Sequence, residues 1–324
     1  MTTFKYIEQV KNKRGVVVFS DPAGAKACLA IVKELNKENV LVISDRDYSF
    51  YNEFDLDVVS FFANSIYQSF ELFNPEFVLT GTSFPEKIEL DFIREANKRK
   101  IKTFSFVDHW VNIRKRFFSE REHVFPSQIW LIDDEAKEKA LQDGIPEEKI
   151  KITGNPYYSY LKNWKPNISK ENLYKELGLE LSVNYILYAP EPLSTFSLEE
   201  KYGFDELSGL IHLEESLKKS NLTNVVILIK GHPNQKDRIF LNYIRENKTN
   251  TKYIKEHNIN DLLYYSKIVA GYFSNSLVEA NIMGKNVIRV LIDLKDSLLD
   301  PISNKGIGKV ITTTNQLNSY IKEL

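Results

Sequence analysis

Two apolar runs in the second half of the chain are each followed by residues that can bind an anion. The first run spans residues 225–229 and leads through Lys230 and Gly231 into the pair His232-Pro233. Because a proline restricts the residue before it to extended conformations, His232 should be held just beyond the end of a strand. Its imidazole can there donate a hydrogen bond to a phosphate oxygen. The alternative is a loop histidine that only bonds the next turn.

The second run, residues 268–270, passes through a short loop into a helix that opens with hydroxyl and amide side chains. These are Ser274, Asn275 and Ser276, and Glu279 follows them. The unpaired N–H groups and the dipole of a helix N-terminus favour an anion, so we predict a phosphate site here. An ordinary capping box, with Ser276 as the N-cap and Glu279 at the third helical position, would account for the same residues.

A third loop follows the apolar run 185–189 and carries a carboxylate between two prolines, in the order Pro190-Glu191-Pro192. In an open parallel sheet, ligands bind outside the carboxyl ends of the strands. Glu191 is therefore a candidate to contact the base or the sugar of a nucleotide, and a simple turn is the alternative.

The first apolar run of the chain, Gly15–Phe19, also ends in a polar turn. Asp21 follows the run, and Gly24 permits a close backbone approach at the start of the next helix. Asp21 faces the substrate in one interpretation and caps the helix in the other. The turn lacks both the three-glycine dinucleotide fingerprint and the Gly-Lys-Ser/Thr ending of a phosphate loop, which disfavours nicotinamide and P-loop chemistry.

A carboxylate and an imidazole, Asp108 and His109, follow the run 103–106. Two titratable groups at a strand end indicate general-base duty. The basic residues Arg114 and Arg116 come next, and they form either a solvated loop or an electropositive wall for an anionic acceptor or the membrane surface. No group of residues has the spacing of metal ligands, so we expect neither a metal nor a cofactor.

Short β-branched runs alternate with helical segments along the whole chain, which predicts an α/β architecture with parallel sheets. Strands are expected at residues 15–19, 40–43, 77–80, 103–106, 129–132, 150–153, 185–188, 225–229, 252–254, 267–270, 286–290 and 309–311. The rhythm is interrupted by a polar span, 158–184. We therefore expect two Rossmann-like domains facing a cleft: residues 1–160 on the acceptor side and residues 161–324 binding the nucleotide.

Composition narrows the function classes. A net charge of −1 provides no basic field to recruit nucleic acid. The single cysteine, Cys28, excludes a disulfide framework. The first residues lack the apolar core of a signal peptide, and no run approaches a membrane span. We expect a cytoplasmic protein, with peripheral contact at the inner face of the membrane left open.

Together these residues resemble GT-B-type transferases of bacterial surface-polysaccharide assembly, the set that contains CDP-glycerol glycerophosphotransferases, capsule sialyltransferases and Kdo transferases. Sialyltransferases of that fold hold the CMP phosphate with a His-Pro pair and a Ser-Ser/Thr pair, which His232-Pro233 with Ser274 and Ser276 resemble. In many two-domain glycosyltransferases a glutamate at the position that Glu279 resembles binds the ribose hydroxyls.

CDP-glycerol enzymes carry a histidine after an N-domain strand, followed by a basic stretch, which His109 and the residues after it resemble. Their phosphate motif ends in Asp-Tyr-Ser-Ser, where this chain has Gly271-Tyr272-Phe273-Ser274. UDP-GlcNAc 2-epimerases share the fold, a His-Pro-type loop and a Ser…Glu helix start.

The resemblance implies a metal-independent transferase that moves a sugar or related group from a nucleotide-activated donor, CMP- or CDP-linked, to a glycan or lipid-linked glycan acceptor. His232, Ser274 and Ser276 would stabilise charge on the leaving phosphate, and Asp108 or His109 would remove the acceptor's proton. Two alternatives stay open: a UDP-GlcNAc 2-epimerase-like enzyme, and a non-catalytic nucleotide-sugar-binding assembly protein.

Overall fold

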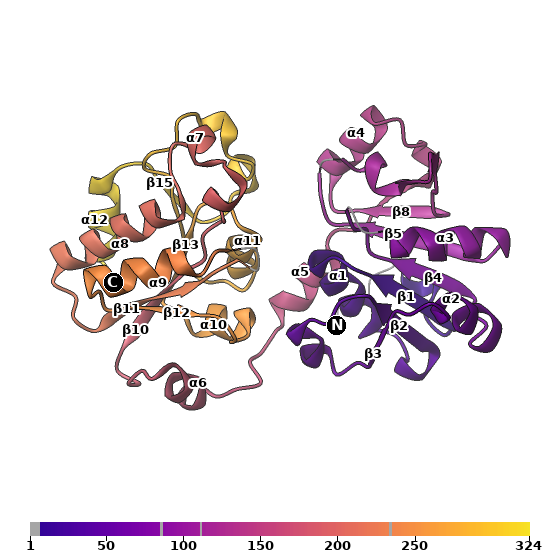
Figure 1. Ribbon diagram of the computed structural model, residues 1–324, viewed down its shortest axis with the longest axis horizontal. Coiled ribbons are helices and arrows are strands. Elements are labelled where there is room, and N and C mark those ends of the chain that lie inside the picture. Colours follow the sequence, from indigo (N-terminus) through magenta and orange to yellow (C-terminus); the bar gives the residue numbers. More distant parts are fainter. Residues whose placement is uncertain (1–6, 85–86, 111, 233–234) are drawn as a thin grey trace. The chain divides into compact units, whose positions relative to one another are not determined.

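The computed structural model describes residues 7–84, 87–110, 112–232 and 235–324. The chain divides into two compact units, unit 1 from Met1 to Tyr160 and unit 2 from Leu161 to Leu324. Figure 1 shows each unit with its own sheet and with helices along it. Both sheets are parallel, so the predicted α/β class with two Rossmann-like units is confirmed.

Unit 1 is built on a seven-stranded sheet in the order β3-β2-β1-β4-β5-β8-β9. Its strands are β1 (Gly15–Phe19), β2 (Val40–Ser44), β3 (Val58–Ser60), β4 (Phe77–Thr80), β5 (Lys102–Val107), β8 (Gln128–Leu131) and β9 (Ile150–Ile152). The helices are α1 (Pro22–Val32), α2 (Ser65–Tyr67), which continues as a π-helical turn (Gln68–Leu72), α3 (Ile88–Lys98) and α4 (Asp134–Gln142). Helix α5 (Pro156–Lys162) begins in unit 1 and ends in unit 2. A short hairpin, β6 (Phe118–Ser119) and β7 (Glu122–His123), follows β5.

The core of unit 1 follows from its apolar strands. Helix α3 presents Phe92 and Ala96 to Val16 and Val18 of β1 and to Val78 of β4. Every residue of β1 and β4 is buried, as expected for strands covered on both faces. Strands added along the chain extend the sheet in opposite directions from β1 and β4, so the topological switch point lies between these two strands.

Unit 2 has a six-stranded sheet in the order β12-β11-β10-β13-β14-β15. Its strands are β10 (Asn184–Tyr188), β11 (Val225–Lys230), β12 (Thr251–Ile254), β13 (Ile268–Gly271), β14 (Val287–Val290) and β15 (Lys309–Ile311). The helices are α6 (Lys170–Leu177), α7 (Glu199–Tyr202), α8 (Glu206–Ser220), α9 (Arg238–Asn247), α10 (Ile259–Tyr265), α11 (Asn275–Ile282) and α12 (Thr314–Lys322).

Alternate residues of the central strands of unit 2 point into two separate cores. Ile186 and Tyr188 of β10 pack with α8, α9 and α12. Tyr185 and Leu187 of the same strand pack with α6, α10 and α11. This alternation is the period of two of a strand covered on both faces. The switch point of this sheet lies between β10 and β13.

The structure differs from the sequence expectation mainly in short or polar elements. Strand β3 and the β6–β7 hairpin lie outside the expected strand ranges. The polar span 158–184 contains α6, which has Ser169 as its N-cap and Gly178 in the left-handed conformation at its C-cap. None of the described helices is long and apolar enough to cross a membrane.

Candidate functional site

In unit 2, the loop after β13 and the start of α11 lie at the switch point. Ser274 is the N-cap of α11, and its Oγ donates to the carbonyl of Ala189 at 3.2 Å. The capping box with Ser276 as N-cap and Glu279 at the third position is therefore wrong: Ser276 is the second helical residue and Glu279 the fifth. Asn275 is exposed, Ser276 is half-buried and Glu279 is buried. The hydroxyl-bearing residues Ser274 and Ser276 both lie at the N-terminus of α11, where an anion would bind.

A glycine allows the two loops of this switch point to meet. A Cβ on Gly271 would lie 2.6 Å from the carbonyl oxygen of Ala189, which is closer than real Cβ contacts come. The next residue, Tyr272, is 1% exposed. Its hydroxyl accepts from the N–H of Gly209 at 2.8 Å and lies 2.9 Å from that of Tyr188. Tyr272 therefore fixes the β13 loop to α8 rather than facing a ligand.

Glu191 sits beside the start of α11. Its Oε1 accepts the N–H of Phe273 at 2.8 Å, and its buried Oε2 bonds none of the described residues. Burial raises the pKa of Glu191 to about 8, although the N–H groups of Phe273 and Tyr272 and the charge of Arg289 favour ionisation. A carboxyl that is largely protonated near neutral pH thus lies at the predicted phosphate site.

His232 follows β11, so the residue lies at the same end of the sheet as the loops after β10 and β13. Burial lowers the pKa of His232 below its ordinary value, so the ring is neutral at physiological pH and can donate from one nitrogen. Its carbonyl accepts the N–H of Gln235 at 2.7 Å. Pro233, the other predicted residue of this loop, lies outside the described residues.

A buried glutamate that sequence reasoning missed joins two of these loops. Glu206, at the start of α8, accepts the N–H and the Oγ of Ser194 at 3.0 and 2.6 Å, and the Nε2 of Gln235 at 2.7 Å. Ser194 follows β10 and Gln235 follows β11. The carboxylate therefore joins the loop after β10 to the loop that carries His232. The only sequence signal of Glu206 is its place directly after the helix N-cap Asp205. An acid at this place usually indicates only a favourable interaction with the helix dipole.

The switch point of unit 1 is organised by another missed carboxylate. Glu89, on α3, is 2% exposed; its Oε1 accepts the N–H of Ser20 at 3.1 Å and the hydroxyl of Ser83. Ser83 Oγ in turn accepts the N–H of Asp21 at 2.9 Å, and Asp21 Oδ2 accepts the N–H of Phe84 at 3.2 Å. Burial raises the pKa of Glu89 to about 7. Asp21 is the N-cap residue of α1 but makes no side-chain cap bond.

Gly24 serves packing within unit 1. A Cβ at this position would lie 3.3 Å from the Cα of Gly81 and 3.3 Å from the N of Thr82. The missing side chain lets α1 lie against the loop after β4. The close approach predicted for Gly24 is thus between its own backbone and that of Gly81 and Thr82.

Asp108 and His109 follow β5, as expected, but they have different partners. Asp108 lies 3.8 Å from Arg116 Nη1, and its buried Oδ1 forms no hydrogen bond with any residue the structure describes. Arg116 Nη1 also donates to the carbonyl of Thr82 at 3.0 Å. His109 Nδ1 accepts the N–H of Trp110 at 3.1 Å. Burial lowers the pKa of His109, against the charge of Asp108.

A hollow of about 710 Å³ lies in unit 1; we call it the basic hollow. Its lining residues are Phe84, Lys87, Asn112, Arg114, Lys115, Phe118, His123 and Asp143. Arg114 is held by His123 Nε2 at 3.1 Å and by the carbonyl of Asp143 at 3.0 Å. Three cations against one carboxylate suit a phosphate or another anion. Arg114 lines the hollow and Arg116 does not, so the two predicted acceptor-side arginines have different surroundings.

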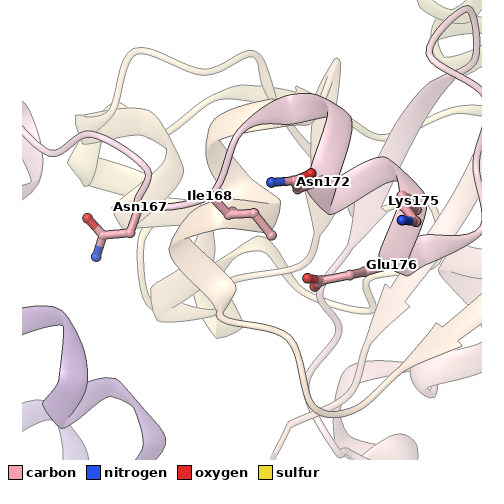
Figure 2. A pocket seen from close by; sticks show the side chains of 5 residues that line it. All are labelled: Asn167, Ile168, Asn172, Lys175 and Glu176. Carbon is pink, nitrogen blue, oxygen red and sulfur yellow. The ribbon is translucent and has the colours of Figure 1, made fainter.

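Two smaller hollows lie in unit 2. One, of about 460 Å³, is lined by Asn167, Ile168, Asn172, Lys175 and Glu176, and Figure 2 shows Asn172 and Glu176 on α6. It contains none of the residues predicted for the site. Within the described ranges, no three His, Cys, Asp or Glu side chains are grouped so that they could hold a metal ion.

Residues 139–324 match the family described as CDP-glycerol:poly(glycerophosphate) glycerophosphotransferase. This match covers more than half of the 324-residue chain. The chain belongs to this glycerophosphotransferase family. It is therefore a member of a transferase family, as the resemblance predicted. A search of curated proteins finds no match.

Solved structures share the GT-B-like fold of this family member. UDP-GlcNAc 2-epimerase from Neisseria meningitidis, bound to UDP-GlcNAc, is 15% identical with a TM-score of 0.64, over 95% of this chain and 90% of that one. The epimerase from Methanocaldococcus jannaschii is 14% identical with a TM-score of 0.64, over 95% and 91%. Anabaena HepE in complex with UDP-glucose is 15% identical with a TM-score of 0.59, over 95% and 90%.

Proposed function

We propose that this protein transfers a glycerol phosphate, or a related sugar or polyol group, from a CDP-linked donor to a hydroxyl of a surface-glycan precursor. In the glycerol phosphate case, the acceptor oxygen attacks the phosphorus that carries the transferred group. A new P–O bond forms, the bond to the bridging oxygen breaks, and CMP leaves with the electron pair. The acceptor's proton passes to a base on the protein.

The observation that carries this proposal is the family match, because it includes the whole of unit 2 and every strand-end loop in it. Those loops hold Ser274 and Ser276 at the N-terminus of α11, and His232 after β11. We assign the donor's phosphates to this end of the sheet. Hydrogen-bond donors placed there before the reaction would stabilise the charge that develops on the leaving CMP. Glu279 stays the proposed ribose contact.

We assign the acceptor to unit 1. Asp108 is the preferred base, because its Oδ1 forms no hydrogen bond with the described residues and lies 3.8 Å from Arg116 Nη1. His109 is the second choice: while Nδ1 accepts from Trp110, the neutral ring carries its proton on Nε2 and has no free lone pair there. The basic hollow would hold the acceptor's anionic groups through Lys87, Arg114 and Lys115.

Turnover assays with separate donors test the proposal. CDP-glycerol, a CMP-linked sugar and UDP-GlcNAc are each incubated with and without a glycerophosphate-primed acceptor, and CMP release and acceptor extension are measured. Acceptor-dependent CMP release is the expected result. Epimerisation of UDP-GlcNAc without acceptor would replace the proposal with the epimerase alternative. Binding of CDP-glycerol without any turnover would instead support a non-catalytic assembly protein. We also propose that turnover needs no metal, which requires it to persist in EDTA.

A further inference from the structure

Glu191 stands out because a carboxyl group occupies the place where the proposed function puts a phosphate. Its Oε1 is held by the N–H of Phe273, the residue directly before the N-cap Ser274. The other oxygen, Oε2, is buried and has no hydrogen-bond partner among the described residues. Prolines on both sides in the sequence restrict the loop that carries it. The group is thus fixed by Oε1, and Oε2 has capacity for one further hydrogen bond.

The charge state of this carboxyl decides what it does to a phosphate. An ionised carboxylate would repel the phosphate strongly, because water screens the two charges only weakly in a buried site. A neutral carboxyl carries one O–H and can donate it to a phosphate oxygen, which gives a short, charge-assisted hydrogen bond. Because the N–H of Phe273 bonds Oε1, the proton belongs on Oε2, the atom without a partner.

We propose that Glu191 binds the donor as a neutral acid, by donating a hydrogen bond from Oε2 to a phosphate oxygen held at the N-terminus of α11. This inference rests on the proposed function, because it takes the donor's phosphates to lie at α11. It makes donor affinity depend on pH through one carboxyl group.

The groups that face Glu191 leave it as the titrating residue of this cluster. Tyr188 on β10, Tyr272 after β13 and Tyr202 on α7 all have pKa values raised by burial, so they stay neutral. Arg289 on β14 is 1% exposed and ion-paired with Asp300, and its Nε donates to the carbonyl of Tyr272 at 3.1 Å.

Across the site, burial lowers the pKa of His232, which therefore titrates in acid. The pKa of Glu191, raised to about 8, lies above that of His232 and below those of the three tyrosines. The phosphates of CDP-glycerol stay fully ionised across this range.

The experiment measures the Kd of CDP-glycerol from about pH 7 to 9.5 by isothermal titration calorimetry on the full chain. If only the neutral form binds, Kd should rise roughly tenfold or more over this range, because the competent fraction falls. Binding at about pH 8.5 should also take up a proton, seen as a heat that changes with the buffer's ionisation enthalpy. Proton uptake by the wild type shows that a group gains a proton on binding, and the variants below identify that group.

Two variants sharpen the test. Glu191→Gln keeps a donor in the same place without titrating, so its Kd should stay near the wild-type value at pH 7 and not change with pH. Glu200→Gln, at an exposed position of α7, is the matched control and should keep the wild-type pH profile. Melting temperatures verify that both variants fold.

A pH-independent wild-type Kd without proton uptake would overturn this inference and leave the proposed donor intact. A wild-type pH slope retained in Glu191→Gln would overturn it as well. Failure of the wild type to bind CDP-glycerol at every pH would overturn the proposed function and this inference together.

Discussion

At the residue scale, buried glutamates order the strand-end loops of both units. Glu89 bonds Ser20 and Ser83 in unit 1, and Glu206 bonds Ser194 and Gln235 in unit 2. A buried carboxylate is expensive to desolvate, and several N–H and O–H donors offset that cost. These acids therefore stabilise one loop arrangement only when all their partners are in place.

Glu89→Gln should change how stability depends on pH. The folded pKa of Glu89 is about 7, above its ordinary value of 4.5, so the folded state holds a proton that the unfolded state has lost. Stability therefore falls as pH rises from about 4.5 to 7, by roughly 3 kcal/mol from this group, and then levels off. The variant removes this loss. Urea unfolding should show it more stable than the wild type at about pH 8 and similar at about pH 5; equal stability at both pH values would contradict the assigned pKa.

Asp108→Asn should cut turnover by roughly a hundredfold or more, the usual scale for a general base, while CDP-glycerol affinity stays the same. The physical reason is that Asn has no basic oxygen for the acceptor's proton. Parallel measurement of His109→Ala identifies which neighbour is the base. Melting temperatures separate chemistry from structural damage, and near-wild-type turnover in both folded variants would place the base elsewhere, with Asp21 the next candidate.

At the element scale, α8 carries the carboxylate that joins the loops after β10 and β11. Glu206→Gln leaves a single acceptor oxygen for three donors, so buried donors lose their partners. We expect a loss of about 1–3 kcal/mol of stability, with weaker CDP-glycerol binding because the loops around His232 loosen. The matched control is Glu215→Gln, at an exposed position of the same helix, which should change neither quantity. Unchanged melting temperature and Kd in Glu206→Gln would show that the loops do not need this carboxylate.

At the scale of the whole molecule, the two units should respond differently to the donor. Hydrogen exchange on the full chain with CDP-glycerol should slow in unit 2, in peptides covering residues 189–197, 231–237 and 271–279. Ligand binding stabilises the native state, so local opening of these loops becomes rarer. Unit 1 should change less until an acceptor is added. Protection confined to unit 1 would reverse the proposed division of labour.

Sequence alone located most strands and the loops that follow them. The ranges Gly15–Phe19, Phe77–Thr80 and Lys309–Ile311 agree with the structure residue for residue. A parallel strand buried on both faces must be a short apolar run, and its carboxyl end must carry the polar residues that follow it in the chain. Very short or largely polar elements, such as β3 and α6 respectively, give no such signal.

Only the tertiary structure decided which side chains meet at those strand ends. Ser20 and Glu89 are 69 residues apart, and Phe273 and Glu191 are 82 residues apart, yet each pair is joined by a hydrogen bond. The order of the strands in each sheet brings the two residues of each pair together, and this order cannot be read from the sequence. Burial then sets the protonation of these carboxyls, because desolvation depends on everything packed around the group. The sequence could therefore predict that Glu191 lies near a ligand, and the fold determines that it stays largely protonated near neutral pH.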